Sequence, residues 1–223
     1  MRHKIDIKGR ISPNDDKDVL EFWDMEYTTP SDVWETIDKV ADGDDVDVYI
    51  NSGGGEIFSG SEIYTALREL DQRANVNIYI TGLAASAASI IAMAAHSAIS
   101  PTAQMMIHCV STIAVGNHND FEKAAEELRE ADKALCSAYM DKAGLTEEEA
   151  LALMEHETWL SASRAVELGL VDEIMFADQE NAPVQMVAAF DPINIEELRA
   201  KMNEQIRRRN RQRQVDLLNL TQR

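Results

Sequence analysis

The stretch VYINSGGG, residues 48–55, is a β-rich apolar run that ends in three glycines. A related run, IYITG at residues 78–82, follows 30 residues later. Each run leads into small residues and then an apolar helical pattern, at 57–70 and at 86–95. Strand, glycine-rich turn and helix, used twice, is typical of a layered α/β fold with parallel strands. We therefore expect both turns at the carboxyl edge of one sheet, where such sheets bind ligands.

Further elements are expected on both sides of this pair. The expected strands are residues 4–11, 46–50, 78–82, 103–110 and 171–176. The expected helices are 31–43 with Ser31 as N-cap, 57–70, 86–95, 121–143 closed by Gly144, 146–154 with a capping box of Thr146 and Glu149, and 161–168 capped by Ser161 and stopped by Gly169.

Two parts of the chain differ in charge. The whole chain carries a net charge of -19, but residues 192–223 hold eight basic and four acidic side chains. We expect an ordered domain over residues 1–178, followed at 179–223 by a linker and a basic tail that is helical or partly disordered. The tail has Ile195, Leu198, Met202 and Ile206 at helical spacing. It is either a solvated segment or a docking segment for an acidic partner.

Composition excludes several classes of function. An acidic body argues against nucleic-acid binding, because phosphates would be repelled. The apolar stretch at 83–95 is too short to span a bilayer, and the polar N-terminus lacks a signal peptide, so we expect a cytoplasmic protein without a membrane partner. Cys109 and Cys136 have no metal-ligand spacing, so neither a metal nor another cofactor is predicted.

The run YITGLAASAAS, residues 79–89, contains the first candidate for chemistry. Ser86 follows a strand and opens a helix, where backbone N–H groups favour a developing oxyanion. This position suits a nucleophile, but it equally suits a plain N-cap. Ser89, one helical turn further on, is expected only to pack.

His108 is the candidate general base for Ser86, because a later strand of the same sheet would bring it to the same edge. Its alternative is a core histidine. Cys109 is assigned to packing, because adjacent strand residues point to opposite faces. Glu157 or Asp172 would orient the imidazole.

The oxyanion would be held by backbone N–H groups. Gly53, Gly54 and Gly55 have no side chains to obstruct an extended substrate, and their N–H groups could act together with that of Ala87. The alternative is a flexible turn.

Four ordered motifs across residues 45–176 together resemble the ClpP family of serine peptidases: YINSGGG, GLAAS, QMMIH, and WLSA with GLVD. The resemblance implies a crotonase-like fold of repeated β-β-α units, with a long protruding handle helix at 121–143 through which subunits assemble into a homo-oligomeric ring. It also implies hydrolysis of peptide bonds in protein or peptide substrates without a metal.

The resemblance further implies roles for individual residues. Ser86 would attack, His108 would transfer the proton, and Gly55 and Ala87 would hold the oxyanion, with Gly53 and Gly54 beside the substrate. Glu157 falls where the family has its triad aspartate.

Departures from the family pattern point to a subgroup. Gly53 stands where the family usually has proline, and only about fifty residues precede the glycines, which argues against docking of an ATPase unfoldase. These features and the basic tail look more like phage and prophage relatives in the bacterial host cytoplasm, which implies a head maturation protease acting on capsid or scaffold proteins. The alternatives are a proteolytic subunit of an ATP-dependent Clp-type protease, a catalytically vestigial assembly protein, and a crotonase-type acyl-CoA hydratase.

Overall fold

The computed structural model describes residues 1–176 and 199–208. They fall into two compact units, one of residues 1–14 and 26–176 and one of residues 15–25 and 199–208. The predicted linker, which begins at residue 179, and the tail residues Ile195 and Leu198 lie outside the described residues. Met202 and Ile206 lie in a helix at 199–208, as their spacing predicts.

A single mixed sheet organises the larger unit. Among the described residues it contains β1 (Arg2–Ile11), β2 (Tyr27–Thr28), β3 (Asp45–Gly55), β4 (Asn75–Ala85), β5 (His96–Ile99), β6 (Gln104–Ile107), β7 (Thr158–Ser161) and β8 (Glu173–Ile174). The order is β2-β1-β3-β4-β5-β8, and all of these neighbours are parallel. β6 pairs parallel with the last residues of β4, and β7 pairs antiparallel with β6. The parallel topology that the repeated strand–turn–helix pattern predicts is confirmed.

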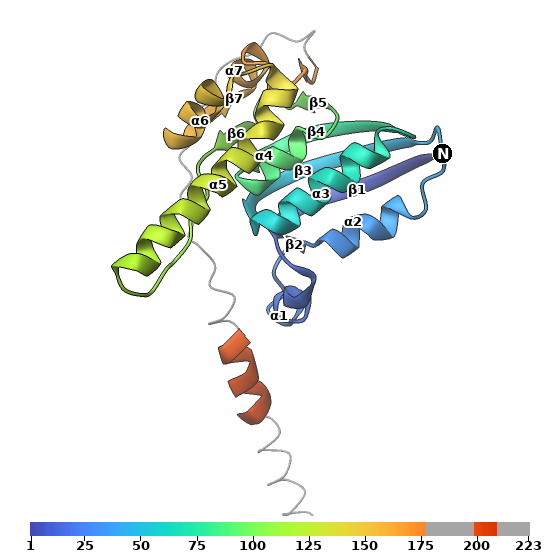
Figure 1. Cartoon of the computed structure of the whole chain (residues 1–223). Helices are drawn as coiled ribbons and strands as arrows, with labels where there is room; N and C mark the ends of the chain where they lie inside the picture. The colour runs from blue at the N-terminus through green and yellow to red at the C-terminus, as the bar shows by residue number, and fades with distance from the viewer. Residues whose placement is uncertain (177–198, 209–223) are drawn as a thin grey trace, which may run out of the picture. The chain divides into compact units, whose positions relative to one another are not determined.

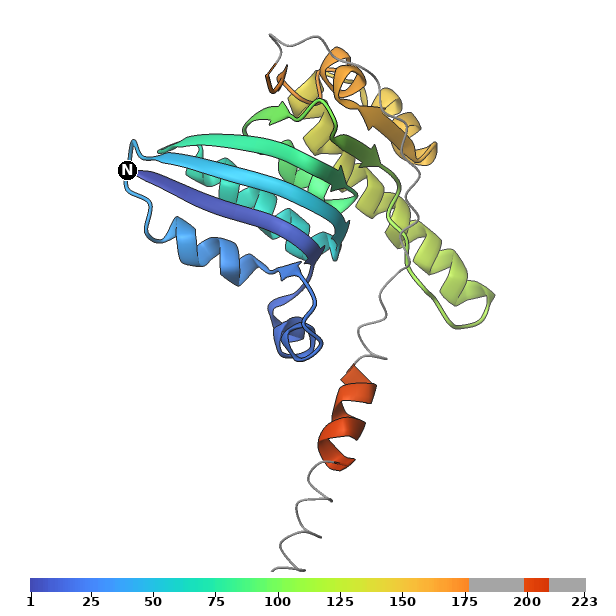
Figure 2. The ribbon, with the colours of Figure 1, turned by 180° about the vertical axis from the view of Figure 1, so that it is seen from behind.

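Helices cover one face of this sheet. They are α2 (Pro30–Ile37), α3 (Ile57–Leu70), α4 (Ala87–Ala92), α5 (His118–Ala143), α6 (Glu147–Glu155) and α7 (Ala162–Glu167). The smaller unit contains α1 (Lys17–Phe22), and a 3-10 turn spans Asn14–Asp16. Figure 1 shows α3 and α4 in front of β1, β3 and β4, and Figure 2 shows the same strands from behind. In both views α5 extends beyond the sheet as a long arm.

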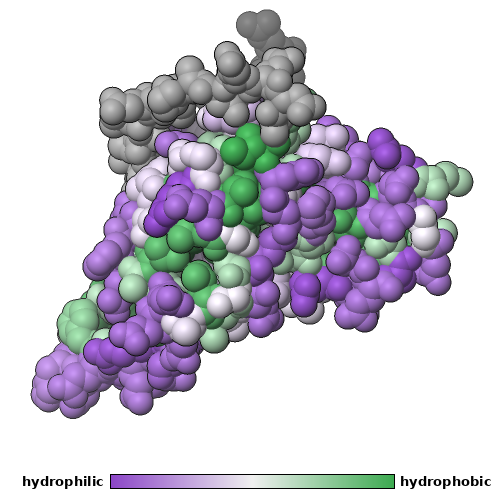
Figure 3. All heavy atoms as spheres, turned by 90° about the horizontal axis from the view of Figure 1, so that it is seen from above, coloured by the Kyte–Doolittle hydropathy of each residue, from purple (hydrophilic) through white to green (hydrophobic). Residues whose placement is uncertain are grey.

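The core lies between the sheet and α3 and α4. Alternate residues of the central strands point toward these helices and are fully buried, among them Val48, Ile50, Ile78 and Ile80. Burial of each such side chain stabilises the fold by about 1.5–3 kcal/mol. On the other face Tyr49 and Tyr79 stack at 5.2 Å between ring centroids. Seen from above, hydrophilic residues cover most of the visible face and hydrophobic ones gather across its middle (Figure 3).

Local signals in the sequence predict several boundaries correctly. The bounds of α3, residues 57–70, are confirmed. Gly144 ends α5 in the left-handed conformation, at φ 68°. Thr146 and Glu149 form the predicted capping box, and the Ser161 hydroxyl accepts from the N–H of Arg164.

Other predictions are wrong. Ser31 does not cap α2. Thr29 does, in a capping box with Asp32, because Pro30 occupies the first helical position and fixes the helix start there. The predicted strand at 103–110 ends at Ile107, so His108 lies beyond it. The glycines are not a flexible turn, since β3 runs through Gly55 and, after a shift in register, Gly54 and Gly55 pair with Arg10 and Ile11 of β1.

Short elements are missing from the sequence-based prediction: α1, β2, β5 and β7. Strands of two to four residues have too little periodicity to be distinguished from loops.

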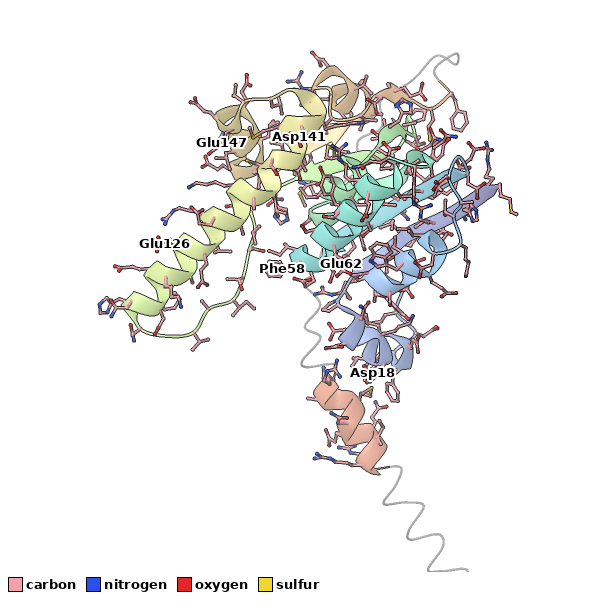
Figure 4. All side chains as sticks on the ribbon, turned by 45° about the vertical axis from the view of Figure 1, so that its right-hand side comes forward. Asp18, Phe58, Glu62, Glu126, Asp141 and Glu147 are labelled. Atoms are coloured by element: carbon pink, nitrogen blue, oxygen red, sulfur yellow. The ribbon has the colours of Figure 1, made fainter. Side chains whose placement is uncertain are left out.

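Figure 4 labels Glu126 and Asp141 on α5 and Glu147 on α6, which belong to the acidic surface of this part of the chain. None of the helices within residues 1–176 and 199–208 is long and apolar enough to span a membrane.

Candidate active site

Ser86 and His108 meet at the carboxyl edge of the sheet. Ser86 follows β4 and His108 follows β6, and these strands are parallel neighbours. The N–H of Ser86 donates to the carbonyl of Met106 at 3.0 Å, which fixes the two chain segments to each other. The Oγ of Ser86 lies 2.7 Å from Nε2 of His108. A hydroxyl and an imidazole at this distance can exchange a proton.

The backbone of Ser86 is strained. Its φ of 54° and ψ of -128° are rare for a residue with a side chain. Such a conformation costs of the order of 1–3 kcal/mol and persists only where the surroundings enforce it. Although Ser86 occupies the N-cap position of α4, its side chain makes no cap hydrogen bond and meets His108 instead.

Glycines allow the β3 backbone to approach Ser86 closely. A Cβ on Gly54 would lie 2.6 Å from the carbonyl oxygen of Ala85 and 2.7 Å from the Cβ of Ser86. The N–H of Gly54 is already used, because it donates to Oγ of Ser52 at 3.0 Å. Gly55 and Ala87, the two predicted oxyanion donors, line the same pocket as Ser86 and His108. Gly53 lies in β3 and is half-buried.

The rest of this pocket is mainly apolar. Its other lining residues are Ile57, Ile90, Val110, Ser111, Leu135, Tyr139 and Met154. Phe58, labelled in Figure 4, follows Ile57 at the start of α3 and is 76% exposed. Leu135 and Tyr139 lie on the long helix that the sequence predicts at 121–143, and neither is singled out there. Their spacing of four residues, which places both on one helix face, was the available signal.

Glu157 directly precedes β7, and its carboxylate makes its hydrogen bond to a residue other than His108. The antiparallel pairing of β6 and β7 ends at Ile107 with Thr158, and Glu157 lies just outside it, in a turn with a φ of 46°. The Oε1 of Glu157 instead accepts from Nε1 of Trp159 at 3.4 Å, a long hydrogen bond. Among residues 1–176 and 199–208, no carboxylate is hydrogen-bonded to His108.

Asp172, the other candidate to orient His108, belongs to a separate cluster. Its carboxylate accepts from the backbone N–H of Ser97 at 2.7 Å and from Lys142, and His96 lies 3.3 Å away. Burial raises the pKa of Asp172, but the hydrogen bonds from Lys142 and Ser97 outweigh it, so the pKa lies below the ordinary value. These contacts tie the end of α5 to β5.

Cys109 packs against the core, as the sequence-based assignment has it. The physical reason differs, because Cys109 lies beyond β6 and not within a strand. Burial and the nearby Asp132 carboxylate raise the pKa of its thiol to about 11. The thiol is therefore protonated at neutral pH and is a poor nucleophile.

Comparison with known proteins identifies the family. The family model described as Clp protease matches residues 34–178. The chain belongs to the Clp protease family. This is a family of serine peptidases, and the match covers all four motifs, including Ser86 and His108.

Individual relatives agree with this assignment. The ATP-dependent Clp protease proteolytic subunit of Bacteroides fragilis is 32% identical over 62% of this chain and 68% of its own length. That of Deinococcus radiodurans is 31% identical over 61% of this chain and 68% of its own length. The chain therefore spans about two thirds of these relatives.

A solved structure supports the fold. A ClpP1 mutant from Listeria monocytogenes superimposes with a TM-score of 0.62 at 22% identity, covering 77% of this chain and 90% of the other. The ClpP-like α/β fold with its long helix is thus confirmed.

Proposed function

We propose that this protein is a serine endopeptidase and acts as a proteolytic subunit of a Clp-type protease. The observation that carries the proposal is the 2.7 Å contact between Ser86 Oγ and His108 Nε2, at a pocket edge where Ser86 is held in a strained conformation. The relatives described as proteolytic subunits support the same activity.

The proposed reaction begins with proton transfer from Ser86 to Nε2 of His108 as Oγ bonds to the scissile carbonyl carbon. The N–H groups of Gly55 and Ala87 would donate hydrogen bonds to the oxyanion that forms. The C–N bond then breaks as His108 returns the proton to the leaving amine, which leaves an acyl ester on Ser86. His108 then takes a proton from water as the water attacks this ester, and it returns the proton to Oγ of Ser86 as the C–O bond breaks and the second product leaves.

The apolar pocket supports a preference for substrates with an apolar side chain next to the scissile bond. Its walls include Ile57, Ile90, Leu135 and Met154, and burial of an apolar side chain there contributes about 25 cal/mol per Å². We further propose that α5 contributes to assembly into a homo-oligomeric ring, since the relatives are described as subunits.

A fluorophosphonate probe tests the nucleophile. We expect one probe group on the wild-type protein by intact mass, none on Ser86→Ala, and unchanged labelling of Ser137→Ala, whose serine lies on α5 and is exposed. The probe reacts as Oγ displaces fluoride from phosphorus and His108 takes the proton. Equal labelling of Ser86→Ala, or no labelling of an assembled wild-type protein, would reject the proposal in favour of a catalytically vestigial assembly protein.

Glu157 is proposed to orient His108 during catalysis. Glu157 and His108 each adjoin the last pair of β6 and β7, Ile107 with Thr158, and the carboxylate would have to break only a 3.4 Å hydrogen bond to Trp159 in order to turn. We expect Glu157→Gln to lower kcat at least about tenfold, because an amide does not stabilise the imidazolium. Trp159→Phe, which removes the competing donor, should keep full kcat. A Glu157→Gln enzyme with wild-type kcat would show that Ser86 and His108 work without it.

A second candidate function is maturation of phage heads. The proposal rests on the basic composition of the tail, which lies beyond the family match at residues 34–178. Intact mass of purified wild-type and Ser86→Ala protein would distinguish the two functions when combined with capture of a Clp unfoldase. Loss of the tail in the wild type alone, with no unfoldase bound, favours head maturation. An intact tail together with unfoldase binding favours the Clp-type subunit.

A further inference from the structure

We propose that Ser89 and Tyr139 are positioning residues that orient the N–H of Ala87 toward the oxyanion. This inference rests on the proposed peptidase function. The Oγ of Ser89 donates to the carbonyl of Ser86 at 2.6 Å and lies 2.8 Å from Oη of Tyr139. Both side chains are buried, at 0% and 2% exposure. The sequence suggests only packing for Ser89, and the structure gives it two hydrogen bonds.

Counting hydrogens fixes the direction of this chain. A serine hydroxyl carries one hydrogen, and that of Ser89 goes to the carbonyl of Ser86. The phenol of Tyr139 must therefore donate to Oγ of Ser89. Burial raises the pKa of Tyr139 above its ordinary value, although the hydrogen bond to Ser89 opposes this, so the phenol keeps its proton at neutral pH.

The geometry of the peptide bond carries the effect to the pocket. The carbonyl of Ser86 and the N–H of Ala87 belong to one peptide unit, and no peptide bond in the described residues is cis. In a planar trans unit the two groups point in opposite directions, so a partner that holds the carbonyl also aims the N–H. Hydrogen bonds to the carbonyl also make the N–H of the same unit a stronger donor.

The contribution of Ser89 is partial, because the same carbonyl also accepts from the backbone N–H of Ser89 at 2.9 Å and from that of Ile90 at 3.4 Å. Loss of a direct oxyanion donor costs about 10²–10³ in kcat. We therefore expect Ser89→Ala to lower kcat by about tenfold and to change KM less than about twofold, because the oxyanion exists only in the transition state.

Tyr139 acts through Ser89, so its effects should not multiply with those of Ser89. Tyr139→Phe removes one oxygen atom and keeps the ring in place. We expect it to lower kcat about threefold, and the double variant to equal Ser89→Ala.

Two matched controls are available. Ser137 donates to the carbonyl of Ala134 at 2.6 Å, the same i to i−3 bond, but it is exposed on α5. Tyr64 is a partly buried tyrosine that packs against the core outside the pocket. Ser137→Ala and Tyr64→Phe should keep wild-type kcat.

The experiment measures kcat and KM for a fluorogenic peptide with all five variants, the wild type and Ser86→Ala. Kinetics of Ser89→Ala matching Ser137→Ala, a multiplicative double variant, or a rise in KM at constant kcat would each overturn the inference. If Ser89→Ala does not fold, the comparison of Tyr139→Phe with Tyr64→Phe decides. A wild type without Ser86-dependent hydrolysis would instead reject the proposed function, and the inference with it.

Discussion

His108→Ala is expected to lower kcat for peptide hydrolysis by about 10⁴-fold, the largest effect of any single substitution outside Ser86. His108 is the group hydrogen-bonded to Oγ of Ser86, at 2.7 Å. Without it, Ser86 has no base to accept its proton, and the leaving amine has no acid. Because the substrate contacts proposed above are made by the apolar pocket walls, KM should change much less than kcat.

The measurement is peptide hydrolysis by assembled protein, together with the rate of fluorophosphonate labelling. His118→Ala is the matched control, since His118 is an exposed histidine at the start of α5. Added imidazole should restore part of the activity of His108→Ala, because removal of the side chain leaves space beside Ser86. More than a tenth of wild-type kcat remaining in His108→Ala would contradict its role as general base.

Gly54→Ala should both lower kcat strongly and destabilise the fold. The new Cβ would lie 2.6 Å from the carbonyl oxygen of Ala85 and 2.7 Å from the Cβ of Ser86, and Gly54 also has a φ of +89°. The carbonyl is a backbone atom of the segment that holds Ser86, so relief of the overlap must move the nucleophile. We expect a loss of at least about 10²-fold in kcat and about 2–4 kcal/mol in the free energy of unfolding.

Gly43→Ala separates the cost of the positive φ from the cost of the overlap with Ala85 and Ser86. Gly43 has a similar φ of +82°, but a Cβ there would meet nothing within 4 Å. Gly43→Ala should therefore lower the free energy of unfolding by only about 1–2 kcal/mol, the cost of the backbone conformation, and keep full kcat. Chemical denaturation and peptide hydrolysis of both variants provide the test. Equal activity of Gly54→Ala and Gly43→Ala would show that the close approach of β3 to Ser86 is dispensable.

Regular, local patterns made much of the fold predictable. The apolar helical pattern predicts α3, Gly144 predicts the end of α5, and Thr146 predicts the start of α6. Each signal depends only on residues within one or two helical turns, and these predictions are confirmed. The short strands β5 and β7 were not predictable, because they exist only through pairing with β4 and β6. The predicted N-cap of α2 was wrong because proline favours the first helical position, so the helix begins at Pro30 and Thr29 is its N-cap.

The sequence by itself determined the parallel α/β plan and identified Ser86, His108 and the glycines as candidates, because the order of strand, turn and helix restricts which ends share a sheet edge. Only the tertiary structure decided which side chains meet there. Glu157 and His108 each adjoin the last pair of β6 and β7, but Glu157 contacts Trp159, and Ser89 meets Tyr139 from 50 residues away. Such contacts depend on side-chain rotamers and on packing between distant segments, which no local periodicity encodes.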